Sequence, residues 1–208
     1  MNIKIAEYAG FCFGVERAIK IADDSALEYD EDLYTFGPLI HNPQEVERLE
    51  KKGIKCINDI DKFPQKSNII FRSHGISKLI EDELKYAGHN IIDTTCPYVK
   101  AVHKKVEDFY KKGYNIVIVG NSDHPEVKGI NGYSNNEAYI VNSLQDVDLL
   151  PNLENVCIVS QTTNRKEMFD EIVNAIENKS ENVEVFNTIC NATTKRQNAA
   201  YELAKEVD

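Results

Sequence analysis

The sequence has no apolar run long enough to cross a membrane. Its longest runs, such as residues 116–119, fall far short of the ~20 residues that span a bilayer. No basic stretch followed by an apolar core opens the chain, so a secretory signal is not expected. Cysteine is scarce and odd in number, and five such residues fit reduced thiols better than a disulfide framework. These features predict a cytoplasmic protein.

Positive charge is also in deficit. The 24 Lys and Arg residues are outnumbered by 34 Asp and Glu residues, which gives a formal net charge of −10. This balance argues against a general nucleic-acid or membrane-surface binder, although it leaves room for one local anion site. A hydrophobic content of 42% and a charged content of 28% are typical of a globular protein and exclude a disordered chain.

Short β-rich runs alternate with helical patterns along the whole chain. The predicted strands are residues 3–5, 69–71, 91–92, 116–119, 156–159 and 183–185. The predicted helices are residues 15–27, 77–87, 98–110, 166–176 and 194 to the end. This alternation predicts an α/β fold with parallel sheets.

Three cysteines recur in one context, directly after a strand-like run and directly before a helical one. They are Cys12, Cys96 and Cys190, separated by 84 and 94 residues. This period predicts repeated α/β units whose loops converge at the carboxyl ends of parallel strands, where α/β sites form. Cys56 and Cys157 lie inside apolar runs instead, and we expect them to be inert thiols.

Histidines recur in equivalent loops, each after a strand-like run and before a helix or turn: His41, His74 and His124. Thr162 and Thr163 occupy a further loop of this type, although threonine is also a common helix N-cap residue. His89 falls at the end of a predicted helix and His103 within one, and we interpret these two as surface or capping histidines.

This combination of residue types suggests a metal cluster beside an anion site. Helix N-termini lower thiol pKa values and suit an anionic cluster. Structural zinc sites usually use closely spaced cysteine pairs, which the sequence lacks, whereas iron–sulfur clusters are bound by thiolates and normally have four. Three ligands would leave one iron open to substrate. The histidines could hold a phosphate, and Glu126 could donate a proton.

Seven ordered motifs carry a family resemblance from residue 3 to about residue 200. They read GFCFGVERAI, GPLIHNPQEVERL, SHG, DTTCPYV, HPEV, SQTT and TICNATTKRQ. Together they resemble the LytB-type 4-hydroxy-3-methylbut-2-enyl diphosphate reductases of non-mevalonate isoprenoid synthesis. That resemblance implies a trefoil of α/β units around one four-iron four-sulfur cluster, with Cys12, Cys96 and Cys190 as its ligands.

The resemblance also implies a role for each loop residue. His41, His74 and His124 would line the diphosphate pocket together with Thr162 and Thr163. Glu126 would be the proton source, with the two threonines in its relay. The reaction would be reductive loss of the allylic hydroxyl, with isopentenyl and dimethylallyl diphosphate as products. Reduced ferredoxin or flavodoxin would be the electron donor.

The resemblance divides the chain into residues 14–96 and 97–190, two α/β units, with 1–13 and 191–208 as parts of a third. Only 18 residues follow Cys190, and the family's later serine and asparagine contacts to the diphosphate are absent. We therefore expect the third unit to be incomplete, the terminal segments to be mobile and the 208-residue chain alone to be nearly inactive.

Two other functions are compatible with the sequence. One is an inactive metal- or diphosphate-binding module. The other is a cysteine phosphatase, because Cys190 and Arg196 form a C-x₅-R string between a strand and a helix. In that case the thiolate would be the nucleophile and the arginine a phosphate clamp.

Overall fold

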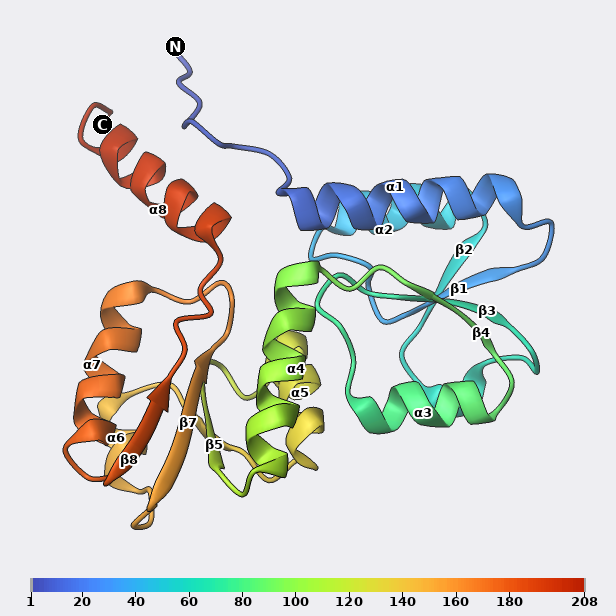
Figure 1. Ribbon diagram of the computed structural model, residues 1–208. Helices are drawn as coiled ribbons and strands as arrows, with labels where there is room; N and C mark the ends of the chain where they lie inside the picture. The colour runs from blue at the N-terminus through green and yellow to red at the C-terminus, as the bar shows by residue number, and fades with distance from the viewer. Residues whose placement is uncertain (1, 208) are drawn as a thin grey trace.

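Two small parallel sheets organise the protein, whose computed structural model describes residues 2–207 (Figure 1). The first sheet has the order β2-β1-β3-β4, and its strands are β1 (Leu33–Phe36), β2 (Ile54–Ile57), β3 (Asn68–Phe71) and β4 (Asn90–Asp93). The second has the order β6-β5-β7-β8, with β5 (Asn115–Val119), β6 (Tyr139–Val141), β7 (Asn155–Ser160) and β8 (Asn182–Val185). The two sheets thus repeat one topology, and all their strand pairs are parallel.

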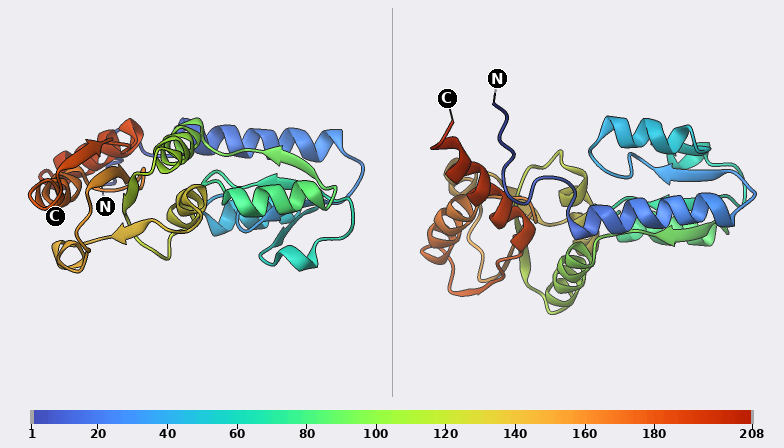
Figure 2. Two further views of the ribbon diagram at one scale, coloured as in Figure 1. Left: turned by 60° about the horizontal axis from the view of Figure 1, so that its bottom comes forward. Right: turned by 90° about the horizontal axis from the view of Figure 1, so that it is seen from above.

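Helices cover both faces of each sheet (Figures 1 and 2). They are α1 (Phe13–Glu28), α2 (Pro43–Glu50), α3 (Lys78–Tyr86), α4 (Pro97–Lys111), α5 (Pro125–Asn131), α6 (Leu144–Asp148), α7 (Lys166–Glu177) and α8 (Asn191–Ala204). Short 3₁₀ turns occupy Ile60–Lys62 and Gly132–Ser134. Neighbouring strand residues face opposite cores, as in β3, where Ile70 packs with α1 and α2 residues while Phe71 packs with Leu84 of α3.

The second sheet is built in the same way. Its strands alternate between a core with α6 and α7 and a core with α4 and α5. Within β7, for example, Ile158 belongs to the first core and Val159 to the second. The predicted α/β architecture with parallel sheets is confirmed. None of the helices within residues 2–207 combines the length and apolarity needed to cross a bilayer.

The predicted strand at residues 3–5 is wrong. Ile3 and Ile5 are each 79% exposed, and this stretch forms no strand in the structure. A short β-prone run is marginal without a neighbouring strand, and within residues 2–207 neither sheet includes this run. The segment instead runs beside α8 (Figure 1), and Lys4 forms an ion pair with Glu206, two residues after the end of that helix.

Candidate functional site

The loops singled out by the sequence lie at the two points where the strand order reverses. In the first sheet the chain leaves the neighbouring strands β1 and β3 toward His41 and His74. In the second sheet it leaves β5 and β7 toward His124 and Thr162. Ligands of open α/β sheets bind at such switch points, outside the carboxyl ends of the strands. The two switch points contribute to one site.

Backbone hydrogen bonds repeat between the two units and fix these loops. Two residues after β3, the Ser73 carbonyl accepts the Cys96 amide at 2.9 Å. Two residues after β7, the Thr162 carbonyl accepts the Cys190 amide at 2.8 Å. Each cysteine backbone is therefore held by the loop of the adjacent strand, and Ser73 also donates its amide to Leu39 O in the loop that leads to His41.

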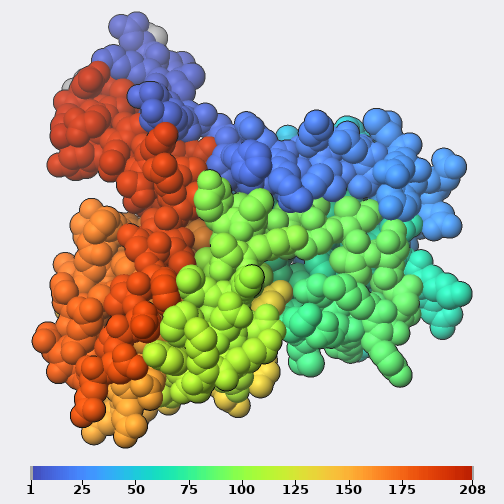
Figure 3. Space-filling model, in the orientation of Figure 1, coloured from blue at the N-terminus to red at the C-terminus, as the bar shows by residue number. Residues whose placement is uncertain are grey.

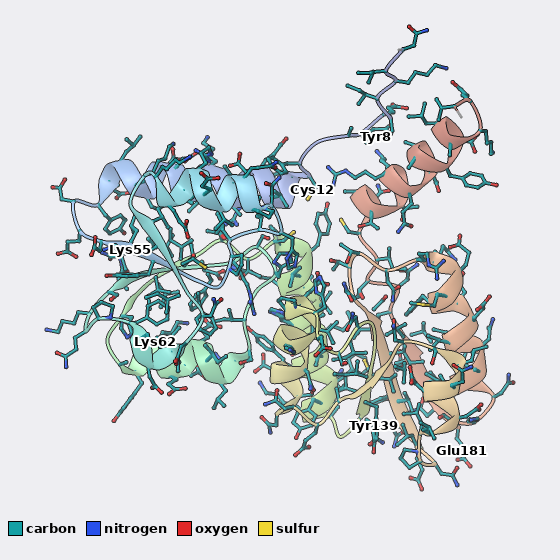
Figure 4. The ribbon with its side chains drawn as sticks, turned by 180° about the vertical axis from the view of Figure 1, so that it is seen from behind. Tyr8, Cys12, Lys55, Lys62, Tyr139 and Glu181 are labelled. Atoms are coloured by element: carbon teal, nitrogen blue, oxygen red, sulfur yellow. The ribbon has the colours of Figure 1, made fainter. Side chains whose placement is uncertain are left out.

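The three predicted cysteines occupy the same position in three helices. Cys12, Cys96 and Cys190 are the N-cap residues of α1, α4 and α8. All three line one cavity of about 190 Å³, which His74 and Glu126 also line. Figure 4 shows Cys12 at the start of α1, where the two units meet α8. The structure thus brings together thiols that are 84 and 94 residues apart in the sequence.

A glycine makes room between the thiols. A Cβ atom on Gly14 would lie 2.6 Å from Cys96 Sγ and 4.0 Å from Cys12 Sγ, so no larger residue fits there without displacing a thiol. In the part of the chain that the structure describes, no three His, Cys, Asp or Glu side chains are close enough to hold a single metal ion. The three cysteines instead line the cavity beside Gly14.

The Cys96 thiol lies at a helix N-terminus, yet its pKa is not lowered. Burial raises its pKa above the usual value, and the nearby Cys12 and Cys190 thiols raise it further. The amides of Tyr98 and Val99 act in the opposite direction but do not prevail. A positive group in the cavity would reverse this balance, because it would stabilise the thiolates.

The three predicted histidines form one cluster. The ring centroid of His41 lies 4.2 Å from that of His74 and 5.2 Å from that of His124, and the last two are 5.7 Å apart. Burial lowers the pKa of each imidazole, that of His74 to about 3. His74 Nδ1 is buried without a hydrogen-bond partner among the described residues. Neutral imidazoles with an unused polar atom suit a ligand that supplies charge or hydrogen bonds.

Arg72 belongs to this cluster and was missed in the sequence. Its guanidinium is partly buried and contributes to lowering the pKa of each of the three histidines, which places a fixed positive charge beside them. The Nε atom donates to Gly75 O at 3.1 Å. An arginine that ends the apolar run of β3 and precedes a histidine was the available signal.

Glu126 connects the two halves of the site. The residue is 1% exposed, and its Oε1 and Oε2 accept hydrogen bonds from the Thr162 amide at 2.6 Å and the Thr162 hydroxyl at 2.8 Å. Burial raises its pKa although both bonds oppose the shift. The Glu126 amide donates to His124 Nδ1 at 3.1 Å, so the proton of the neutral imidazole resides on Nε2.

The remaining predicted residues are placed as follows. Thr163 is exposed at the cavity and accepts a hydrogen bond from Gln161 Nε2 at 2.9 Å. Cys157 is fully buried, and burial raises its pKa to about 12. Cys56 is half-buried, outside the cavity. The surface interpretation of His103 is wrong, because its ring is 4% exposed and stacks on Tyr133.

The phosphatase alternative is not supported by the structure. A phosphate clamp needs the Arg196 guanidinium to face its own Cys190 loop with free donors. Instead Arg196 donates through Nε and Nη2 to the carbonyls of Tyr8 and Gly10, each at 2.9 Å. The same bonds hold the segment that leads to Cys12.

Comparison with known proteins agrees with this geometry. A family model described as LytB protein matches residues 3–208. The chain belongs to the LytB family. Among relatives of this LytB chain, the 4-hydroxy-3-methylbut-2-enyl diphosphate reductase of Caldanaerobacter subterraneus subsp. tengcongensis is 50% identical over all of the chain and 73% of the relative. The enzyme of the same name from Clostridioides difficile is 47% identical over all of the chain and 75% of the relative.

Solved structures show the same relationship. The chain resembles a structure of (E)-4-hydroxy-3-methyl-but-2-enyl diphosphate reductase, the terminal enzyme of the non-mevalonate pathway, with a TM-score of 0.82 and 46% identity. That match covers 99% of the LytB chain and 74% of the solved one. A reductase structure from Plasmodium falciparum matches with a TM-score of 0.89 and 33% identity over 95% of the chain and 63% of the solved one.

Proposed function

We propose that this LytB chain acts in the reductive dehydroxylation of 4-hydroxy-3-methylbut-2-enyl diphosphate to isopentenyl and dimethylallyl diphosphate. The reaction consumes two electrons and two protons and releases water. One observation carries the proposal: thiols from three helices line a single cavity with His74 and Glu126. The relatives that match the whole chain bear the name of this reductase.

The donor set of the cavity fits a four-iron four-sulfur cluster. Three thiols are the ligands that such clusters use, and the N-termini of α1, α4 and α8 favour a negatively charged group between them. Gly14 leaves the space that a side chain would otherwise fill. Cys12, Cys96 and Cys190 would hold the cluster, which when bound would supply electrons to the substrate. A one-electron carrier such as reduced ferredoxin or flavodoxin would be its source.

The histidine cluster would bind the diphosphate. His41, His74 and His124 present three rings within 5.7 Å of one another, and the Arg72 guanidinium lies beside them. In the free site the low pKa values keep the imidazoles neutral. A diphosphate would raise those values, because its negative charge stabilises the imidazolium form. Binding would therefore draw protons into the site.

Glu126 would hold the proton that the leaving hydroxyl needs. Its raised pKa favours the protonated carboxyl, whose Oε2–H can donate to Thr162 Oγ1. The Thr162 hydroxyl is then free to donate its own hydrogen into the cavity that both residues line. Thr163 lies next to this pair at the exposed side of the cavity and would contact the substrate.

The proposal is tested by loading the chain with iron and sulfide under anaerobic conditions and adding the substrate with dithionite-reduced methyl viologen. We expect substrate to change the electron paramagnetic resonance spectrum of the cluster, and we expect at most a trace of the two products from the 208-residue chain. His74→Phe should weaken the substrate-induced change, whereas Cys56→Ser, a matched change outside the cavity, should leave it intact. A loaded protein whose spectrum does not change at saturating substrate would contradict the proposal.

A further inference from the structure

An arginine links the helix after Cys12 to the loop before Cys96. Arg17 lies five residues after Cys12 in α1 and is half-buried. Its Nη1 atom donates to the carbonyls of Thr94 and Thr95 at 3.3 and 3.4 Å, the two residues that directly precede Cys96. The side chain thus fixes the start of α1 relative to the start of α4, at the level of two cavity thiols.

A second arginine makes the same kind of link between Cys190 and Cys12. Arg196 lies six residues after Cys190 in α8 and also lines the cavity. Its two hydrogen bonds reach the carbonyls of Tyr8 and Gly10, at 2.9 Å each, four and two residues before Cys12. The space-filling view shows the N-terminal segment seated against α8 along this contact (Figure 3).

We propose that Arg17 and Arg196 are positioning residues that tie the three cysteine loops into one cradle. Each extends from the helix after one cysteine to carbonyls within the four residues before the next, so the pair connects Cys190 to Cys12 and Cys12 to Cys96. The inference rests on the proposed cluster, because the cradle matters only if the thiols share a ligand. Arginine suits these links because one guanidinium can donate to two carbonyls at once.

Arg196 also places positive charge where a cluster would carry negative charge. Arg196 lines the cavity, and a guanidinium stays protonated throughout the working pH range. A fixed positive charge stabilises the more negative, reduced state of a nearby cluster. Loss of that charge should therefore lower the reduction potential, whereas a purely mechanical defect would leave it unchanged.

The first arm of the test uses the metal-free chain and does not depend on a cluster. Chymotrypsin cleaves after tyrosine, and the Tyr8 carbonyl is the group that Arg196 Nε binds. We expect Arg196→Gln and Arg196→Lys to speed cleavage of the Tyr8–Ala9 bond about three- to tenfold, because a lysine cannot replace the fork. For Arg17→Lys we expect Cys96 to be alkylated faster relative to Cys56, as measured by peptide mass spectrometry.

The second arm uses the loaded chain. We expect both lysine variants to release iron to a chelator about three- to tenfold faster than wild type. Arg196→Gln should in addition lower the reduction potential, which Arg196→Lys should preserve. Arg48→Gln is the matched control, since Arg48 of α2 pairs with Asp23 of α1 and with Glu45 of its own helix, away from the cysteines. It should change neither cleavage, iron release nor potential.

The outcomes separate the two proposals. If the wild-type chain assembles no cluster, the proposed function fails while the cleavage and alkylation results still decide whether the clamps exist. If the wild-type chain loads normally and both lysine variants match it in cleavage, alkylation and iron release, the positioning role is wrong. Faster cleavage with unchanged iron release would equally overturn it, because the clamps would then not act on the cradle.

Discussion

Replacement of Gly14 by alanine tests whether the space between the cavity thiols is needed to bind the cluster. The residue is buried in the first turn of α1, and the added Cβ would approach Cys96 Sγ to 2.6 Å. Ordinary contact begins at 3.4 Å, so the Cys96 thiol would have to retreat by about 0.8 Å. Overpacking of this kind costs roughly 1–3 kcal/mol, while the better helix propensity of alanine returns up to about 1 kcal/mol.

The fold should therefore survive while the cluster does not. We expect Gly14→Ala to lower the free energy of unfolding of the metal-free chain by no more than about 2 kcal/mol, measured by urea denaturation. Displacement of one thiol should weaken cluster retention at least about tenfold, or 1.4 kcal/mol, measured by iron and sulfide content after chelation.

Gly129→Ala is the matched control, because its new Cβ would meet nothing closer than 3.6 Å in a helix of the same fold. It should retain the wild-type cluster content. If Gly14→Ala retained full iron and sulfide with an unchanged spectrum, the cavity between the thiols would not be where the cluster binds.

Three further outcomes follow from the buried ionisable groups. Glu126→Gln keeps the size of the side chain but removes the proton, so in a chain extended to the full length of its relatives the rate should fall roughly 10²–10⁴-fold at unchanged cluster content. Substrate affinity should rise as pH falls from about 8 to about 6, because a bound diphosphate raises the lowered pKa values of His41, His74 and His124. Calorimetry in buffers of different ionisation enthalpy should show proton uptake on binding. A pH-independent affinity without proton uptake would contradict this prediction. Burial lowers the pKa of His103 from 6.5 to about 4, so the contribution of its neutral form to stability is complete above pH 6.5 and is lost as pH falls toward 4. His103→Phe should therefore remove up to about 3 kcal/mol from the acid-dependent loss of unfolding free energy measured by urea titration. An unchanged pH profile would show that His103 is not the group responsible.

Much of the fold was readable because its signals are local. Apolar runs such as residues 116–119 predicted five of the strands, and regular apolar spacing predicted the long helices. The error at residues 3–5 arose because β propensity says nothing about whether a neighbouring strand exists. The strands β1, β2 and β6 were not predicted from the sequence.

The site was predictable where one loop position recurs, and not where residues act across the fold. The strand–Cys–helix context led to three thiols that line one cavity. Arg17 and Arg196 were not recognisable as links between loops, because their hydrogen-bond acceptors are backbone carbonyls far along the chain. Thr94 O is 77 residues from Arg17, and Tyr8 O is 188 residues from Arg196. His103 looked like a surface residue because the partner that covers it, Tyr133, comes from a distant 3₁₀ turn.

The central claim, that three dispersed thiols form one cluster site, is tested most directly by substituting each of the five cysteines with serine and measuring iron, sulfide and visible absorbance after anaerobic loading. The account predicts that Cys12→Ser, Cys96→Ser and Cys190→Ser each lose the brown colour and most of the iron. Cys56→Ser and Cys157→Ser should keep both, since those thiols lie outside the cavity. A fully coloured Cys96→Ser protein with wild-type iron content would contradict the account.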